Sequence, residues 1–95
     1  MAVSQPAKFG ESWSDDRVRA YLDRQPPAGV NADFHVLYTA YKHMRADDFA
    51  RFLGYFLEAG RDIEARNADG QRLRDVIASH PQSAAFVQLL DDTAA

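Results

Sequence analysis

Residues 53–70 read LGYFLEAGRDIEARNADG, and this stretch decides the fold. Apolar residues at helical spacing run up to Gly60, and glycine ends helices because it adopts the left-handed conformation without strain. A charged turn follows, with the apolar residues Ile63 and Ala65 at alternate positions. The Asn-Ala-Asp-Gly run at 67–70 is typical of a tight turn. The stretch therefore predicts the junction between two helix pairs of a stacked helical array.

Apolar residues also recur three and four positions apart on both sides of this stretch, which is the spacing of an amphipathic helix. Ser14 and Asn31 suit helix N-caps, and the Pro26-Pro27 pair ends the first helix. Pro81 suits the first position of the last helix. The sequence predicts an all-α fold of about five helices, over residues 15–24, 32–44, 47–59, 72–79 and 81–91.

The helix predicted over 47–59 has the clearest apolar stripe. Its members follow the i, i+3, i+4, i+7, i+8 pattern and are Phe49, Phe52, Leu53, Phe56 and Leu57. Gly54 interrupts this helix and costs about 1 kcal/mol relative to alanine. We expect Gly54 to allow the close approach of a neighbouring helix.

The 95 residues correspond to one domain, which we expect to comprise a flexible arm over 1–12 and one helical domain over 13–95. The net charge of −3 argues against nucleic acid and anionic membranes as partners. The chain has no cysteine, which excludes disulfides and thiolate chemistry. It has neither a run of ~20 apolar residues nor the apolar region of a secretory signal, so we expect a cytoplasmic protein.

The two helix pairs repeat with a fixed offset, because Phe56-Leu57 and Leu89-Leu90 are 33 residues apart. A period of 33 residues is that of ankyrin repeats. Residues 57–70 resemble the segment that leaves one ankyrin repeat and enters the next. The resemblance covers about residues 30–92, and it implies two degenerate ankyrin-like units. It departs at Gln71-Arg72-Leu73-Arg74, which replaces the Thr-Pro-Leu-His of that family, so the hydroxyl–imidazole bonding between repeats cannot form.

The whole chain also resembles a small family of uncharacterised proteins from Pseudomonas and related bacteria. The matching residues are Ser14-Asp15-Asp16, the run from Arg45 to Phe49, and the run from Ala59 to Asp62. This resemblance implies a bacterial cytoplasmic protein and no particular chemistry.

Two repeat units are fewer than the three that a stacked array needs to bury a continuous core. We expect the helix over 15–24 to act as an N-terminal cap on the first pair. The residues that would cover that pair are Trp13, Val18, Tyr21 and Leu22. The alternative is a homodimer that completes the stack.

The sequence offers few groups for catalysis or metal binding. The three histidines, His35, His43 and His80, match no metal-binding pattern. The acidic pairs Asp15-Asp16 and Asp47-Asp48 begin helices, where negative charge offsets the helix dipole. We therefore predict no enzyme activity, no metal and no cofactor, and we rank an enzyme or small-ligand binder last among the functions.

The function that this architecture favours is a protein–protein interaction module that uses the turn and a helix face. The candidate partner-binding residues are Arg66, Asn67, Asp69, Arg72 and Arg74. Tyr38 and Tyr41 are expected to reach the surface beside them, where exposed aromatic side chains anchor partners. The plainer interpretation is a solvated charged turn, and the alternative function is a self-associating structural protein.

Overall fold

The computed structural model describes residues 13–94, in which the regular elements are helices and one isolated β-bridge. The helices are α1 (Asp15–Arg19), which continues as the 3₁₀ turn η1 (Ala20–Asp23), α2 (Ala32–His43), α3 (Ala46–Glu58), α4 (Leu73–Ile77) and α5 (Ala84–Ala94). The predicted all-α fold with about five helices is confirmed. The arm predicted over 1–12 lies outside the described residues.

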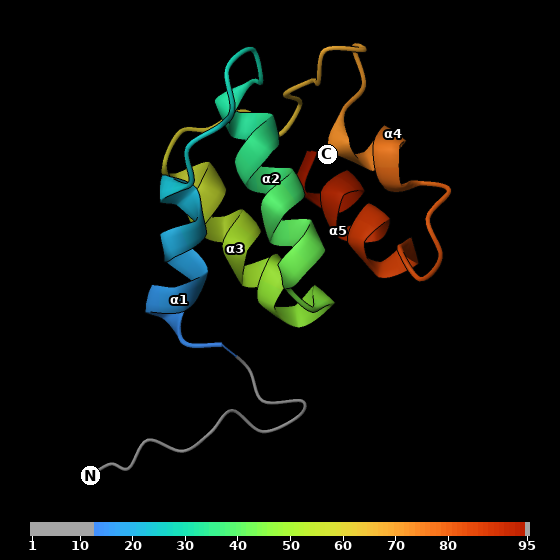
Figure 1. The fold of residues 1–95 in the computed structure, drawn as a ribbon. Coiled ribbons are helices and arrows are strands. Elements are labelled where there is room, and N and C mark those ends of the chain that lie inside the picture. The colour runs from blue at the N-terminus through green and yellow to red at the C-terminus, as the bar shows by residue number, and fades with distance from the viewer. Residues whose placement is uncertain (1–12, 95) are drawn as a thin grey trace, which may run out of the picture.

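The helices form two layers (Figure 1). The antiparallel helices α2 and α3 are joined by Met44 and Arg45, and a longer connection leads to the pair α4 and α5. Helix α2 packs beside α4, and α3 packs beside α5, so each pair contributes one helix to each layer. Helix α1 packs against α3, which places it at the side of the first pair. None of the helices within residues 13–94 is long and apolar enough to cross a bilayer.

The centre of the core is the apolar face of α3. Phe49, Phe52 and Phe56 are completely buried, and each contributes about 1.5–3 kcal/mol by leaving water. The ring of Phe86 meets Phe49 edge-on at 5.2 Å between centroids, which joins α3 to α5. The predicted stripe of α3 is thus the core of the molecule.

Two predictions for α3 are wrong. Leu57 is 45% exposed, although it continues the apolar pattern. A Cβ built on Gly54 would meet no atom within 4 Å, so this glycine does not mediate a close helix contact. Successive helical residues turn by about 100°, so Gly54 and Leu57 lie on the side of α3 that α1, α2 and α5 do not cover.

Helix α1 is docked as the sequence predicts. The Ser14 hydroxyl accepts a hydrogen bond from the Arg17 amide, and Val18 and Tyr21 are buried in the main core. Trp13 and Leu22 are partly buried against the same core.

Arg51 of α3 fastens the start of α1. Its guanidinium donates to the Trp13 carbonyl (2.6 Å), to Asp48 Oδ1 (2.8 Å) and to the carboxylate of Asp15. Asp48 also accepts from the Trp13 amide (3.3 Å) and is only 1% exposed. The prediction that Asp48 only offsets the helix dipole is therefore incomplete, because Asp15 and Asp48 converge on one arginine across two helices.

The segment after α3 begins as predicted, with Gly60 in the left-handed region at φ +77°. Arg61 then donates to Asp33 Oδ1 (2.9 Å) and to the Leu22 carbonyl (2.8 Å), which ties the turn to the first turn of α2 and to η1. Ala65 is buried and Ile63 is half-buried, which agrees with their predicted alternation.

Residues 66–72 form a hairpin, here called the finger, closed by the isolated bridge between Arg66 and Arg72. Asn67 Oδ1 accepts from the amides of Asp69 and Gln71, both at 2.9 Å, and Gly70 adopts φ +79°. Asn67 therefore bonds to the backbone of the turn, because an Asx side chain reaches amides that follow it along the chain.

The last two helices are shorter at their facing ends than predicted. Helix α4 ends at Ile77, and α5 begins at Ala84 instead of Pro81. The intervening turn holds Gln82 at φ +63°, which no helix accommodates. The buried Ser83 hydroxyl lies 2.7 Å from the Ile77 carbonyl and 2.9 Å from the His80 carbonyl, so it closes the turn just before α5.

Candidate functional site

One face of α2 opens onto a groove of about 400 Å³. Phe34, Tyr38 and Lys42 lie four residues apart and so form one line along this face. The loop before α2 and the tip of the finger form the rims, and both lie at the end where α2 begins (Figure 1). We call this hollow the α2 groove, and its lining residues are Pro27, Gly29, Val30, Phe34, His35, Tyr38, Lys42, Asn67, Ala68 and Asp69.

The floor of the α2 groove is aromatic. Phe34 is buried and Tyr38 is half-buried, with 5.8 Å between their ring centroids. Val30 stands at the rim and is 38% exposed. Side chains of this kind bind apolar groups by excluding water, and tyrosine is enriched where proteins make their strongest contacts.

The aromatic row continues towards the end of α2. Tyr41 stacks beside Tyr38 at 6.4 Å, and Phe86 meets Tyr41 edge-on at 5.0 Å. The Tyr41 hydroxyl lies 3.2 Å from His80 Nδ1, which fixes the tyrosine to the turn before α5. A second, shallower hollow of about 550 Å³ follows this row and shares Tyr38 and Lys42 with the α2 groove. The prediction that Tyr38 and Tyr41 reach the surface is confirmed, since both are half-buried.

The structure divides the five predicted partner-binding residues into three groups. Asn67 and Asp69 line the α2 groove. Arg66 is exposed at the base of the finger, where it donates to the Gly70 carbonyl (2.7 Å). Arg72 and Arg74 line a separate cavity of about 20 Å³, which has room for little more than one water molecule.

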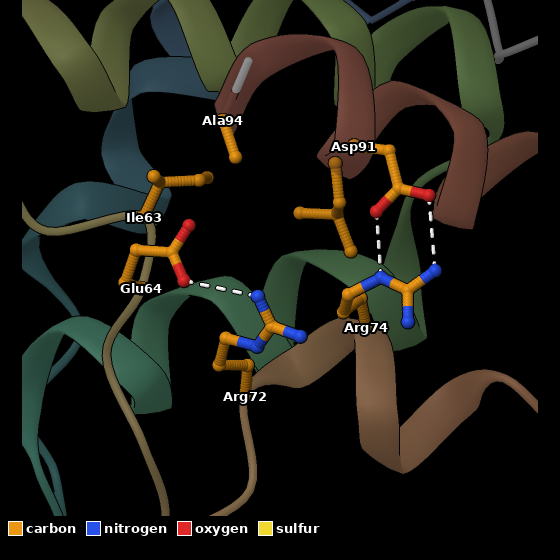
Figure 2. A pocket seen from close by; sticks show the side chains of 7 residues that line it. Ile63, Glu64, Arg72, Arg74, Asp91 and Ala94 are labelled. Atoms are coloured by element: carbon orange, nitrogen blue, oxygen red, sulfur yellow. Dashed lines mark hydrogen bonds and ion pairs between the residues drawn. The ribbon is translucent and has the colours of Figure 1, made fainter.

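Figure 2 shows that the two arginines of this small cavity bind carboxylates of the same chain. Arg74 donates twice to Asp91 (2.6 and 3.0 Å), which joins α4 to α5. Arg72 donates to Glu64 (3.1 Å) and pairs with Asp75 (3.2 Å). The bidentate contact with Arg74 lowers the pKa of Asp91, and the hydrogen bonds from Arg72 lower the pKa of Asp75. These arginines therefore hold α4 in place.

Outside this cavity, the ion pairs among residues 13–94 are those of Arg45, Arg51 and Arg61. His43 Nδ1 lies 3.1 Å from the Tyr21 hydroxyl and His80 Nδ1 lies 3.2 Å from the Tyr41 hydroxyl, so these two histidines pair with different tyrosines. Within residues 13–94 no group of three or more histidine, aspartate or glutamate side chains is arranged to hold a metal ion. The aromatic α2 groove is the candidate site because Asn67 and Asp69 of the predicted set line it.

No family model matches the chain, and no curated protein or solved structure matches it either. The α2 groove is therefore identified from the geometry of this chain alone. The four-residue spacing from Val30 through Phe34 and Tyr38 to Lys42 is the signal by which the sequence could have located the α2 groove. That spacing also fits a buried stripe, and only the packing of α2 separates the two interpretations.

Proposed function

We propose that the chain is a protein-interaction module that binds its partner in the α2 groove. The observation that carries the proposal is the groove itself: about 400 Å³, floored by Phe34 and Tyr38 and bordered by the finger. An apolar hollow with a few polar groups at its rim suits an anchoring side chain of another protein.

The position of the finger supports the same proposal. The resemblance to ankyrin repeats implies binding through the fingers and the inner helix face, and the α2 groove lies between a finger and a helix of this kind. The proposed binding set retains Asn67 and Asp69 from the sequence prediction and adds Val30, Phe34 and Tyr38. Arg66, Arg72 and Arg74 become supports of the finger and of α4. The proposed setting is the bacterial cytoplasm, and the proposed role is binding without catalysis.

Photo-crosslinking in cells tests this proposal. A benzoylphenylalanine at position 38 is expected to form a covalent adduct with another protein, and one at the exposed Glu58 is not. No adduct at position 38, or the same adduct at both positions, would reject the proposal. An adduct between two copies of the chain would establish self-association instead.

Among residues 13–94, the exposed large apolar side chains Val30 and Leu57 provide matched variants. Val30→Asp places a charge at the rim of the α2 groove and is expected to abolish the adduct formed from position 38. Leu57→Asp makes the same change on α3, away from the α2 groove, and is expected to leave that adduct intact. Equal losses in the two variants would show that binding does not depend on the α2 groove.

A further inference from the structure

The α2 groove has unlike charges at its two ends. Lys42 lies in the last turn of α2, and its ammonium lies 4.7 Å from the centroid of the Tyr38 ring. Asp69 belongs to the finger and lines the α2 groove, and the tip of the finger lies beside the start of α2 (Figure 1). Lys42 is ten residues past Ala32, the first residue of α2, which corresponds to about 15 Å along the helix axis. The charges are therefore separated along the aromatic floor.

Neither charge is neutralised within the described part of the chain. The ion pairs among residues 13–94 join five arginines to acidic side chains, and they include neither Lys42 nor Asp69. The other cations that lie over aromatic rings, Arg17, Arg19 and Arg24, belong to the region of α1 and η1. Lys42 is thus the one stacked cation of residues 13–94 that borders the α2 groove.

We propose that the α2 groove receives a protein segment in which a leucine-sized or aromatic side chain is followed, on the Lys42 side, by a carboxylate. The apolar side chain covers Phe34 and Tyr38, and the carboxylate meets the Lys42 ammonium. Asp69 repels a second carboxylate at the other end and favours a basic or neutral residue there. This inference rests on the proposed function, and it adds the chemistry of the partner.

Charge complementarity of this kind decides which segment binds and in which direction. Tyr38 holds the Lys42 ammonium over its ring, so the cation is placed before the partner arrives. The apolar anchor provides most of the affinity, and the two end charges select one orientation of the segment.

A peptide selection with the full chain tests the inference. A display library of random 12-residue peptides is selected against the wild type, against Lys42→Glu and against Arg19→Glu. Arg19 is the matched control because its guanidinium also lies over a tyrosine, at 4.4 Å from the centroid of Tyr55, on another face. Circular dichroism confirms the fold of each variant, and amide shifts in nuclear magnetic resonance spectra show where the selected peptides bind.

Peptides selected by the wild type are expected to carry an apolar anchor and an Asp or Glu, and to shift the amides around Tyr38. Lys42→Glu is expected to weaken them roughly tenfold or more and to select lysine or arginine at the acidic position. Arg19→Glu is expected to change neither property.

Peptides that shift the amides around Tyr38 but show no acidic preference, or that bind Lys42→Glu as well as the wild type, would overturn this inference and leave the proposed function standing. A selection in which no peptide shifts these amides would overturn both.

Discussion

Gly54 and Gly70 differ in what the backbone requires of them. Each has open space where a Cβ would lie. Gly70 adopts φ +79°, which is strained for any other residue, whereas Gly54 is an exposed residue inside α3. Of these two glycines, only Gly70 in the finger is required by its backbone conformation.

Alanine at the two positions is expected to have opposite effects. Gly54→Ala should raise the free energy of unfolding by about 1 kcal/mol, because alanine loses less backbone entropy in a helix. Gly70→Ala should lower it by about 1–2 kcal/mol, because the left-handed conformation brings Cβ against the carbonyl oxygen. Urea denaturation of both variants measures the difference. A destabilised Gly54→Ala variant would mean that α3 needs an approach that only glycine permits.

Asp48 is the most buried acidic residue of the described chain, and it accepts hydrogen bonds from Arg51 and from the Trp13 amide. Asp48→Ala is expected to lower the free energy of unfolding by about 2 kcal/mol, since it removes both hydrogen bonds from a site that water does not reach. Asp47→Ala is the control, because the Asp47 side chain is 62% exposed. Equal effects of the two substitutions in thermal denaturation would assign the loss to the helix dipole alone.

Residue roles that depend on neighbours in the sequence could be predicted, and roles set by distant contacts could not. Ser14 and Asn31 cap helices through the third amide that follows, and Gly60 ends α3. In the sequence Asp48 is one of two acidic residues in a first helical turn, and only the packing of α1 shows that it is buried. Leu57 repeats the apolar spacing, but no helix among residues 13–94 lies over its side of α3.

Helix α4 has five residues, too few to be stable without tertiary contacts. Leu73 and Ile77 anchor it in the core, and its surface is held by the ion pairs of Arg72 and Arg74. The sequence could show that a short helix follows the finger. The sequence predicts the end of this helix too far along, because only the packing places the Ser83 hydroxyl against the Ile77 carbonyl.

The pair formed by Arg74 and Asp91 makes the stability of this part dependent on pH. Arg74 lowers the pKa of Asp91 in the folded chain from the ordinary value of 3.8. The stabilisation is therefore fully present above pH 3.8 and is lost as the pH falls through the lower pKa of the folded state. Asp91→Asn is expected to be less stable than the wild type at pH 7, and the difference should shrink below pH 3.8.

Chemical denaturation of the wild type and Asp91→Asn between pH 7 and pH 2 measures this dependence. Asp92→Asn is the matched control, because Asp92 accepts from Gln88 and forms no ion pair within residues 13–94. A constant difference between wild type and Asp91→Asn over the whole range would show that the ion pair does not stabilise α4 against α5.

The α2 groove forms only when the fold brings distant parts of the chain together. Its walls come from residues 27–30, from one face of α2 and from residues 67–69, which the fold brings together. The sequence identified the finger and the surface tyrosines separately. It could not show that Asn67 and Asp69 lie beside the aromatic row while Arg72 and Arg74 turn to Glu64 and Asp91, since these contacts cross up to 17 residues of chain.

Helix α1 packs against α3 and covers the side of the first helix pair. Val18 and Tyr21 belong to the one core that runs through both pairs, and Arg51 fastens Trp13 and Asp15 to α3.

A chain that starts at residue 25 would leave this part of the core in water, and two helix pairs bury less than a stable array requires. We expect the shortened chain to lose cooperative unfolding in urea and to associate in analytical ultracentrifugation, whereas the full chain unfolds in one transition. If the shortened chain stays monomeric and cooperative with an unchanged midpoint, α1 is not a cap, and the helix pairs alone hold the fold.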